Sequence, residues 1–167
     1  MRSTILRTAM TAVLLAAGAA PALAGPLRVG APAPALGART LDGQEVDLST
    51  LKGMVVVVNL WATWCAPCRA EMPMLDAFYR QHRDQGLVLI GLSADRTRDK
   101  GDVKRVMSAF SYPSAMLAEA KPNGIGEARS LPVTFVVDKA GVVRAVFGED
   151  GTPLTEQKLA EAVGPLL

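Results

Sequence analysis

Residues 55–73 read VVVVNLWATWCAPCRAEMP and include Cys65 and Cys68, the only two cysteines of the chain. The four valines predict a buried strand, because β-branched side chains favour extended backbone and an uninterrupted apolar run suits a strand covered on both faces. After Cys68 the pattern changes to that of a helix, which we expect to end before Gly86. The helical spacing is carried by Ala70, Met74, Ala77, Phe78 and Gln81.

The two cysteines therefore lie where a strand passes into a helix, and this position predicts their chemistry. The first turn of a helix presents unpaired backbone N–H groups and a partial positive charge, which favour a thiolate at Cys65. Cys68 lies one turn further along, close enough to form a disulfide with Cys65 and more shielded from solvent. We expect Cys65 to be the nucleophile and Cys68 to resolve a mixed disulfide.

The WCAPC sequence, the apolar strand before it, Pro73 within the helix and the downstream sequence LPVTF (131–135) resemble the TlpA/ResA-like thiol-disulfide oxidoreductases of the thioredoxin superfamily. The resemblance extends over roughly residues 30–165. It implies an α/β fold, namely a thioredoxin-like three-layer α/β/α sandwich with a mixed sheet and an N-terminal β-hairpin.

The resemblance also implies where a client protein binds. Pro132 is expected to be a cis proline that faces the cysteines, and the backbone of Leu131 is expected to pair with an extended client segment. Trp64, Ala66 and Pro67, which flank Cys65 in sequence, are expected to form the rest of the client-binding surface.

Glu71 is the candidate acid–base group. It follows Cys68 by one helical turn, and it resembles the glutamate that TlpA/ResA-like proteins carry near the active site. A carboxylate there would raise the pKa of a nearby thiol and help Cys68 lose its proton during attack on the mixed disulfide. The buried aspartate of thioredoxin is replaced by Asn59, which cannot exchange a proton. The alternative is that Glu71 is an ordinary exposed helix residue.

The start of the chain predicts export. Arg2 and Arg7, an apolar stretch and the sequence Ala22-Leu23-Ala24 form the three parts of a cleaved signal peptide, residues 1–24. An uncleaved membrane anchor is the minor alternative, although the apolar stretch is short for a bilayer. We expect residues 25–34 to be a lead-in and residues 35–167 to form the thioredoxin-like domain. Removal of the signal leaves 16 basic and 16 acidic residues, so charge gives no reason to expect nucleic acid as a partner.

The other elements follow from periodicity and turn residues. A hairpin is expected around Asp42-Gly43, a strand parallel to the valine strand over 87–92, and an amphipathic helix from about 96 to 110. Residues 125–129 are expected to form one helical turn, and residues 133–138 and 142–147 an antiparallel pair. Thr152 or Thr155 is expected to cap a final helix.

The cysteine pair has four alternative interpretations. A disulfide that closes so short a loop would stabilise the fold little. Zinc would need two further ligands, and His82 is the only histidine. Copper(I) could use Met72 and Met74, but methionines at helical spacing are usually core residues. A thiol peroxidase would need serine or threonine three residues before its reactive cysteine, where this chain has Ala62. We therefore expect neither a metal nor a cofactor.

The sequence and the resemblance together predict a periplasmic monomer that reduces client protein disulfides. A membrane protein of the DsbD or CcdA type would supply its electrons, and the client would be an apocytochrome c thiol pair or a copper-assembly protein. Oxidising or isomerising exchange is the alternative, because no residue pattern fixes the reduction potential.

Overall fold

The structure is a computed structural model and describes residues 27–167. The predicted signal peptide and the first two residues of the predicted lead-in lie outside the described residues. The helices in this part of the chain are α1 (Ala66–His82), α2 (Lys100–Met107) and α3 (Glu156–Val163). The strands are β1 (Gly37–Arg39), β2 (Glu45–Asp47), β3 (Val55–Trp61), β4 (Leu87–Ser93), β5 (Ser114–Met116), β6 (Val133–Val137) and β7 (Val143–Phe147).

Five strands form one mixed sheet in the order β5-β4-β3-β6-β7. The β3–β4 and β4–β5 pairs are parallel, whereas β6 runs antiparallel to both β3 and β7. The predicted parallel crossover and the predicted antiparallel pair are therefore confirmed. Leu60 of β3 pairs with Val133 of β6, so the end of β3 and the start of β6 lie at the same edge of the sheet.

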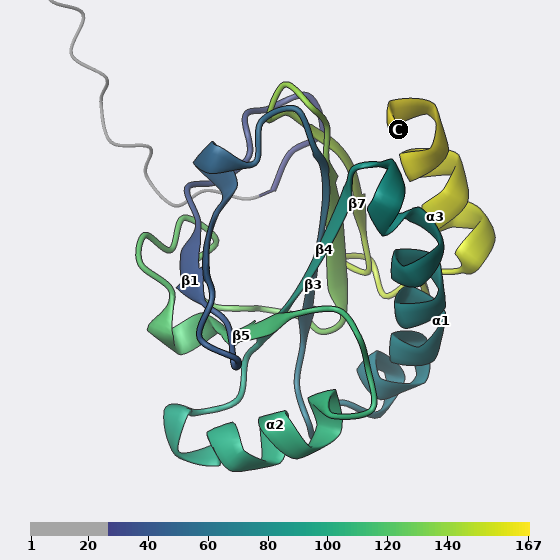
Figure 1. Cartoon of the computed structure of the whole chain (residues 1–167). Coiled ribbons are helices and arrows are strands. Elements are labelled where there is room, and N and C mark those ends of the chain that lie inside the picture. The colour runs from purple at the N-terminus through teal and green to yellow at the C-terminus, as the bar shows by residue number, and fades with distance from the viewer. Residues whose placement is uncertain (1–26) are drawn as a thin grey trace, which may run out of the picture.

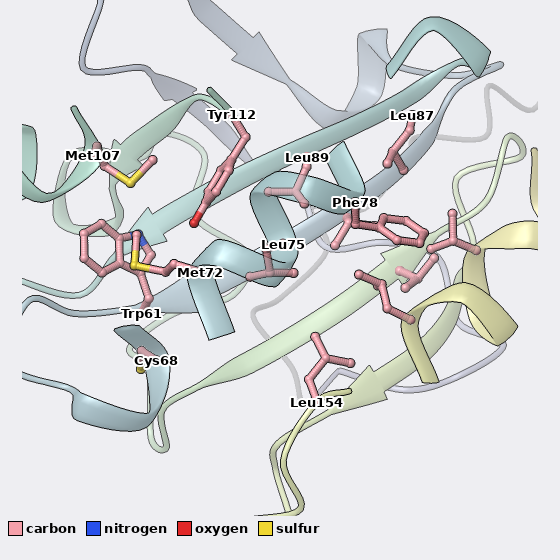
Figure 2. Close-up of a cluster of buried hydrophobic side chains, with 14 of the residues drawn as sticks. Trp61, Cys68, Met72, Leu75, Phe78, Leu87, Leu89, Met107, Tyr112 and Leu154 are labelled. Carbon is pink, nitrogen blue, oxygen red and sulfur yellow. The ribbon is translucent and has the colours of Figure 1, made fainter. Parts of the chain in front are cut away.

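The layers follow from the alternation of side chains along β3, whose seven residues are all buried. Val55 and Val57 pack in a cluster with residues of the three helices, and Figure 2 shows the part of that cluster around Trp61, Met72 and Leu75. Val56 and Val58 face the opposite side. The continuous valine run is explained by burial on both faces.

Helices α1 and α3 lie together over one face of the sheet, and the β1–β2 hairpin covers the other (Figure 1). The hairpin is joined to the sheet by a bridge between Thr40 and Ala115 of β5. Helix α2 lies near the end of the sheet where β3 stops, and its Val103 and Met107 are buried. The predicted thioredoxin-like α/β fold with a mixed sheet and an N-terminal hairpin is confirmed.

The buried side chains of helix α1 share only Phe78 with the set that the sequence spacing indicated. Ala70, Ala77 and Gln81 are exposed, and Met74 is only partly buried. The buried residues are Cys68, Met72, Leu75, Asp76 and Phe78. The helix is turned so that Cys68 faces inward, and this rotation also places a carboxylate in the interior.

The helical turn predicted for residues 125–129 is wrong. No helix is assigned there, because the side chain of Asn123 holds the backbone in a different turn. Its Oδ1 accepts hydrogen bonds from the N–H groups of Ile125 and Gly126 at 3.2 and 2.9 Å. Such side-chain acceptors compete with helical hydrogen bonding.

The N-cap of α3 is Thr155 and not Thr152. Its hydroxyl oxygen accepts a hydrogen bond from the backbone N–H of Lys158 at 3.3 Å.

Candidate active site

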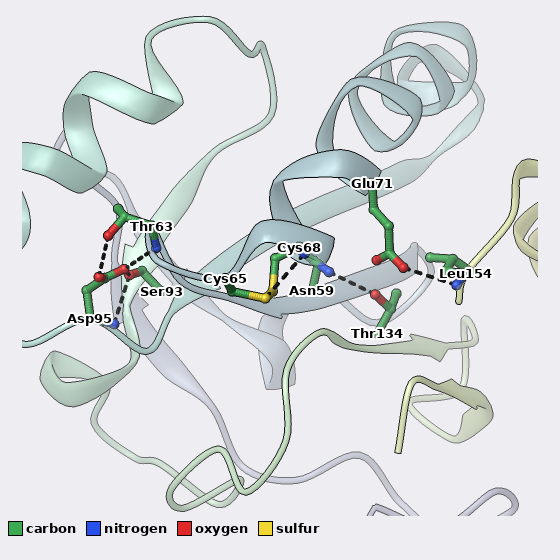
Figure 3. Close-up of a disulfide and its surroundings, with 9 residues drawn as sticks. All are labelled: Asn59, Thr63, Cys65, Cys68, Glu71, Ser93, Asp95, Thr134 and Leu154. Atoms are coloured by element: carbon green, nitrogen blue, oxygen red, sulfur yellow. Dashed lines mark hydrogen bonds between the residues drawn. A yellow bond between two sulfur atoms is a disulfide. The ribbon is translucent and has the colours of Figure 1, made fainter. Parts of the chain in front are cut away.

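The site forms where β3 ends and α1 begins. Trp61 ends the strand, a short turn follows, and Cys65 is the N-cap residue of α1. The two cysteines form a disulfide with their Cα atoms 5.3 Å apart (Figure 3). Pro67 lies in the first turn of the helix, where the fixed φ of proline suits helical backbone and no intrahelical N–H bond is lost. The predicted pairing and its position in the fold are therefore observed.

The surroundings of Cys65 favour a negative charge on its sulfur. The backbone N–H of Cys68 donates a hydrogen bond to Cys65 Sγ at 3.2 Å. Cys65 Sγ is therefore the side-chain acceptor that caps the N-terminus of α1. The same end of α1 carries the positive end of the helix dipole, and its first turn contains no acidic residue. Cys65 is 5% exposed and Cys68 1% exposed, so Cys65 is the less shielded cysteine of the pair.

Asn59 lies on β3 beneath the pair and is 1% exposed. Its Nδ2 donates a hydrogen bond to Thr134 Oγ1 on the neighbouring strand β6 at 2.9 Å. Its Oδ1 is buried and has no hydrogen-bond partner among the described residues. The polar floor of the site therefore contains no group that titrates, and any proton exchange must involve another residue.

Glu71 points from α1 toward the segment before α3 (Figure 3). Its Oε1 accepts a hydrogen bond from the backbone N–H of Leu154 at 3.1 Å, whereas Oε2 is buried without a partner among the described residues. Burial raises the pKa of the Glu71 carboxyl, and the bond from Leu154 partly opposes that rise. Glu71 is half-buried and is not the ordinary exposed helix residue of the alternative reading. No hydrogen bond joins it to either cysteine in this disulfide form.

The predicted client-binding residues lie at the same edge of the sheet. Trp64 is 70% exposed beside Cys65, and Ala66 and Pro67 are exposed between the cysteines. Leu131 and Pro132 are partly buried and directly precede β6, and the peptide bond between them is cis as predicted. Among residues 27–167, no hydrogen bond occupies the backbone N–H or C=O of Leu131.

Two residues that support the site escaped sequence reasoning. Asp95 follows β4, is 3% exposed and binds Thr63 in the turn before Cys65. Gly148 follows β7 with φ +89°, and a Cβ there would overlap the carbonyl oxygen of Pro132. A sequence offers little signal for either residue, because an aspartate after a strand and a glycine after a hairpin strand are common in loops.

The residues of the alternative sites are core residues, lie away from the cysteines or lack the required group. Met72 is fully buried in the core and Met74 packs against it, while His82 lies at the far end of α1 beside Phe78. Within residues 27–167, no three His, Cys, Asp or Glu side chains are arranged to hold a metal ion. Ala62 is fully buried and supplies no hydroxyl near Cys65. No helix of the described chain is long and apolar enough to cross a membrane.

Comparison with known proteins agrees with this geometry. The chain matches the model of the AhpC/TSA family over residues 29–146. A solved thiol:disulfide interchange protein of the thioredoxin family from Chlorobium tepidum superposes with a TM-score of 0.69 at 28% identity, covering 85% of this chain and 99% of that one. A secreted thiol-disulfide isomerase from Corynebacterium glutamicum superposes with a TM-score of 0.65 at 27% identity, covering 80% of this chain and 84% of that one.

The chain therefore belongs to the AhpC/TSA family of thioredoxin-fold proteins. The thiol-disulfide oxidoreductase ResA of Bacillus cereus is 34% identical over 126 residues, covering 74% of this chain and 72% of the relative. ResA of Geobacillus kaustophilus is 26% identical over 167 residues, covering 96% of each chain. With the cysteine pair at the N-terminus of α1, this chain is a thiol-disulfide oxidoreductase of the ResA type, and its clients are proteins that contain thiols or disulfides.

Proposed function

We propose that this protein is an exported thiol-disulfide reductase that acts on client proteins in the periplasm. The observation that carries the proposal is the disulfide at the first turn of α1, with Cys65 as the more exposed cysteine and Glu71 half-buried on the same helix. When ionised, the Glu71 carboxylate disfavours a thiolate in its neighbourhood, which makes the dithiol form less stable relative to the disulfide. A cysteine pair whose disulfide form is favoured over its dithiol form donates electrons readily.

The proposed cycle starts from the reduced pair. The Cys65 thiolate attacks one sulfur of a client disulfide, so that a mixed disulfide forms and the other client sulfur leaves as a thiolate. Cys68 loses its proton, with Glu71 as the proposed acceptor, and its thiolate attacks Cys65 Sγ. The second client thiolate leaves, and the Cys65–Cys68 disulfide remains. The client gains two electrons, and a membrane dithiol donor of the DsbD or CcdA type returns two electrons to the pair.

The client is proposed to bind across Trp64 and the segment Leu131–Pro132. The exposed indole offers apolar contact beside Cys65. The backbone of Leu131, which has no hydrogen-bond partner among residues 27–167, offers hydrogen bonds to an extended client strand. The two client types that we propose are an apocytochrome c thiol pair and a copper-assembly protein. Both remain candidates, and we propose that the protein acts as a monomer.

Export rests on the sequence pattern of residues 1–24, and the secreted relative from Corynebacterium glutamicum supports it. Mass spectrometry of the protein from the periplasmic fraction tests this proposal directly. A chain that begins at Gly25 would support cleavage after Ala24. A full-length chain in the membrane fraction would support the uncleaved anchor, and a full-length soluble chain in the cytoplasm would refute export.

The reduction potential of the Cys65–Cys68 pair tests the direction of electron flow. A value near or below about −270 mV, as in thioredoxin, supports a reductase that must be recharged. A value near about −120 mV, as in DsbA, would show that the protein oxidises or rearranges client disulfides. This second function is the alternative candidate, and the isomerase from Corynebacterium glutamicum is the relative that favours it.

Trapping tests the assigned roles of the two cysteines. With Cys68→Ser, the mixed disulfide on Cys65 cannot be resolved from within the protein, and covalent client complexes should accumulate. Cys65→Ser is the matched control and should trap far less, because Cys68 is 1% exposed. Equal trapping by the two variants would contradict the assignment of Cys65 as the nucleophile.

A further inference from the structure

A buried carboxylate lies close to the turn that leads into Cys65, and the cycle described above does not use it. Asp95 follows the end of β4 and is 3% exposed. Its Oδ2 accepts hydrogen bonds from the Thr63 N–H at 2.8 Å and from the Ser93 hydroxyl at 2.7 Å. Its Oδ1 accepts from the Thr63 hydroxyl at 2.7 Å. Figure 3 shows this cluster on one side of the disulfide and Glu71 on the other.

These contacts fix the turn before the nucleophile. Thr63 is bound through both its backbone and its side chain, and it precedes Cys65 by two residues. A third tether joins the same segments, since the Ala94 N–H donates to the Trp61 carbonyl oxygen at 2.8 Å. The path from β3 into α1 is thereby attached to the end of the neighbouring strand, independently of the disulfide itself.

The charge of Asp95 is not neutralised by a cation. In the described part of the chain, no lysine, arginine or histidine forms an ion pair with it, and the adjacent Arg96 pairs with Asp99 instead. Arg69 and Glu71 of α1 follow the cysteines in sequence, and Arg105 of α2 lines the same surface hollow as Ala66 and Arg69. A buried negative charge is screened less than a surface one and acts on neighbouring groups over a longer distance.

We propose that Asp95 is a positioning residue that fixes the turn before Cys65 and, through its charge, shifts the Cys65–Cys68 pair toward the disulfide. The charge disfavours the Cys65 thiolate and opposes the helix N-terminus, so that the reduced form is less stable and a stronger electron donor. The inference rests on the proposed function only in that the pair must be redox-active. It predicts a shift in potential whichever way electrons flow.

Asp95→Asn tests the role of the charge while keeping the shape. The amide oxygen can accept from the Thr63 N–H and from Ser93, and the Thr63 hydroxyl can rotate to accept from the amide nitrogen. We expect the pKa of the Cys65 thiol to fall by about 0.5–1 unit. Above both pKa values, the equilibrium constant for reduction should then increase about three- to tenfold, and tenfold is about 30 mV for a two-electron couple.

The measurements are the pH dependence of Cys65 alkylation by iodoacetamide in the reduced protein and the redox equilibrium with glutathione at pH 9. Asp84→Asn is the matched control, because it removes an exposed carboxylate at the other end of α1. Thr63→Val keeps the Asp95 charge and removes one tether. It should slow exchange with a small disulfide several-fold and leave the thiol pKa near that of the wild type.

A change in Asp95→Asn no larger than that in Asp84→Asn would overturn the proposal. If Asp95→Asn does not fold, Asp95→Ser removes the same charge and keeps a hydroxyl acceptor. Failure of both to fold would assign Asp95 to stability alone and would also overturn it. A wild-type protein that fails to reduce clients, with the shift nevertheless present, would refute the reductase and leave the role of Asp95 intact.

Discussion

Gly148 offers a sharp test of how the fold positions the client-binding segment. It follows β7 with φ +89°, a left-handed conformation that side chains other than that of glycine disfavour. A Cβ atom at this position would overlap Pro132 O and lie 3.1 Å from Pro132 C and 3.4 Å from Val133 Cα. These neighbours are all backbone atoms, so no side-chain rotation can relieve the overlap. Gly148→Ala should therefore displace the segment that contains Pro132.

The size of the effect can be separated into two contributions. A Cβ in the left-handed region costs about 1–2 kcal/mol. Overpacking in a well-packed site costs about 1–3 kcal/mol more. Gly148→Ala should thus lower the free energy of unfolding by about 2–5 kcal/mol, as the sum of these two contributions. Gly141→Ala isolates the first, because Gly141 has φ +83° and a Cβ there would meet no atom within 4 Å.

Urea unfolding of the oxidised proteins measures both losses of stability, and stopped-flow exchange with a client peptide disulfide measures function. We expect the rate of exchange to fall in Gly148→Ala and to be unchanged in Gly141→Ala, since only the first substitution acts on Pro132. Equal losses of stability and equal exchange rates in the two variants would refute the reasoning. They would show that the close approach to Pro132 neither constrains the fold nor positions the site.

Three further substitutions test individual contacts. Because the fold raises the pKa of Glu71, its ionised carboxylate lowers the stability of the protein at neutral pH. Glu71→Gln should therefore increase the resistance to urea at pH 8. This gain should disappear below about pH 4.5, where the carboxyl is protonated in the unfolded state as well. Burial alone would raise the pKa of Asp76, but hydrogen bonds from Ser111 and the charge of Arg80 outweigh burial and lower it. Asp76→Asn should lower the free energy of unfolding by about 1–3 kcal/mol at pH 7. In urea titrations, the difference in stability between this variant and the wild type should shrink as the pH falls below 3.8. Leu75→Ala should cost about 2–5 kcal/mol in the same assay, and the fold described here is wrong if it costs no more than an exposed α1 substitution.

The site was more predictable than its supports because its signals are local. A valine run, a change of hydrophobic period and a Cys-x-x-Cys pair lie within one short stretch, and each has a direct structural meaning. Asp95 acts through Thr63, and Gly148 acts through Pro132, which precedes it in the chain by a full hairpin. Neither contact leaves a pattern in a single sequence, since each depends on how separate strands meet at one edge of the sheet.

The rotation of α1 was missed for a related reason. Helical spacing gives a stripe but cannot choose between two stripes of similar apolar content, and Ala70, Ala77 and Gln81 are small or polar enough to lie at the surface. The choice is made by the tertiary contacts of Cys68 and Leu75 with the sheet. Asp76 lies in the interior because its carboxylate accepts hydrogen bonds from the N–H and hydroxyl groups of Ser111, which offset the cost of burial.

The geometry also explains why the Cys-x-x-Cys motif alone cannot give the reduction potential. The helix N-terminus and the Cys68 N–H stabilise a thiolate at Cys65, which favours the reduced pair. Glu71 and Asp95 lie on opposite sides of the disulfide, and we propose that both act in the other direction (Figure 3). The first two contributions belong to any such motif at a helix start. The carboxylates come from positions that the motif does not include, so the balance, and with it the direction of electron transfer, is determined by the surrounding fold.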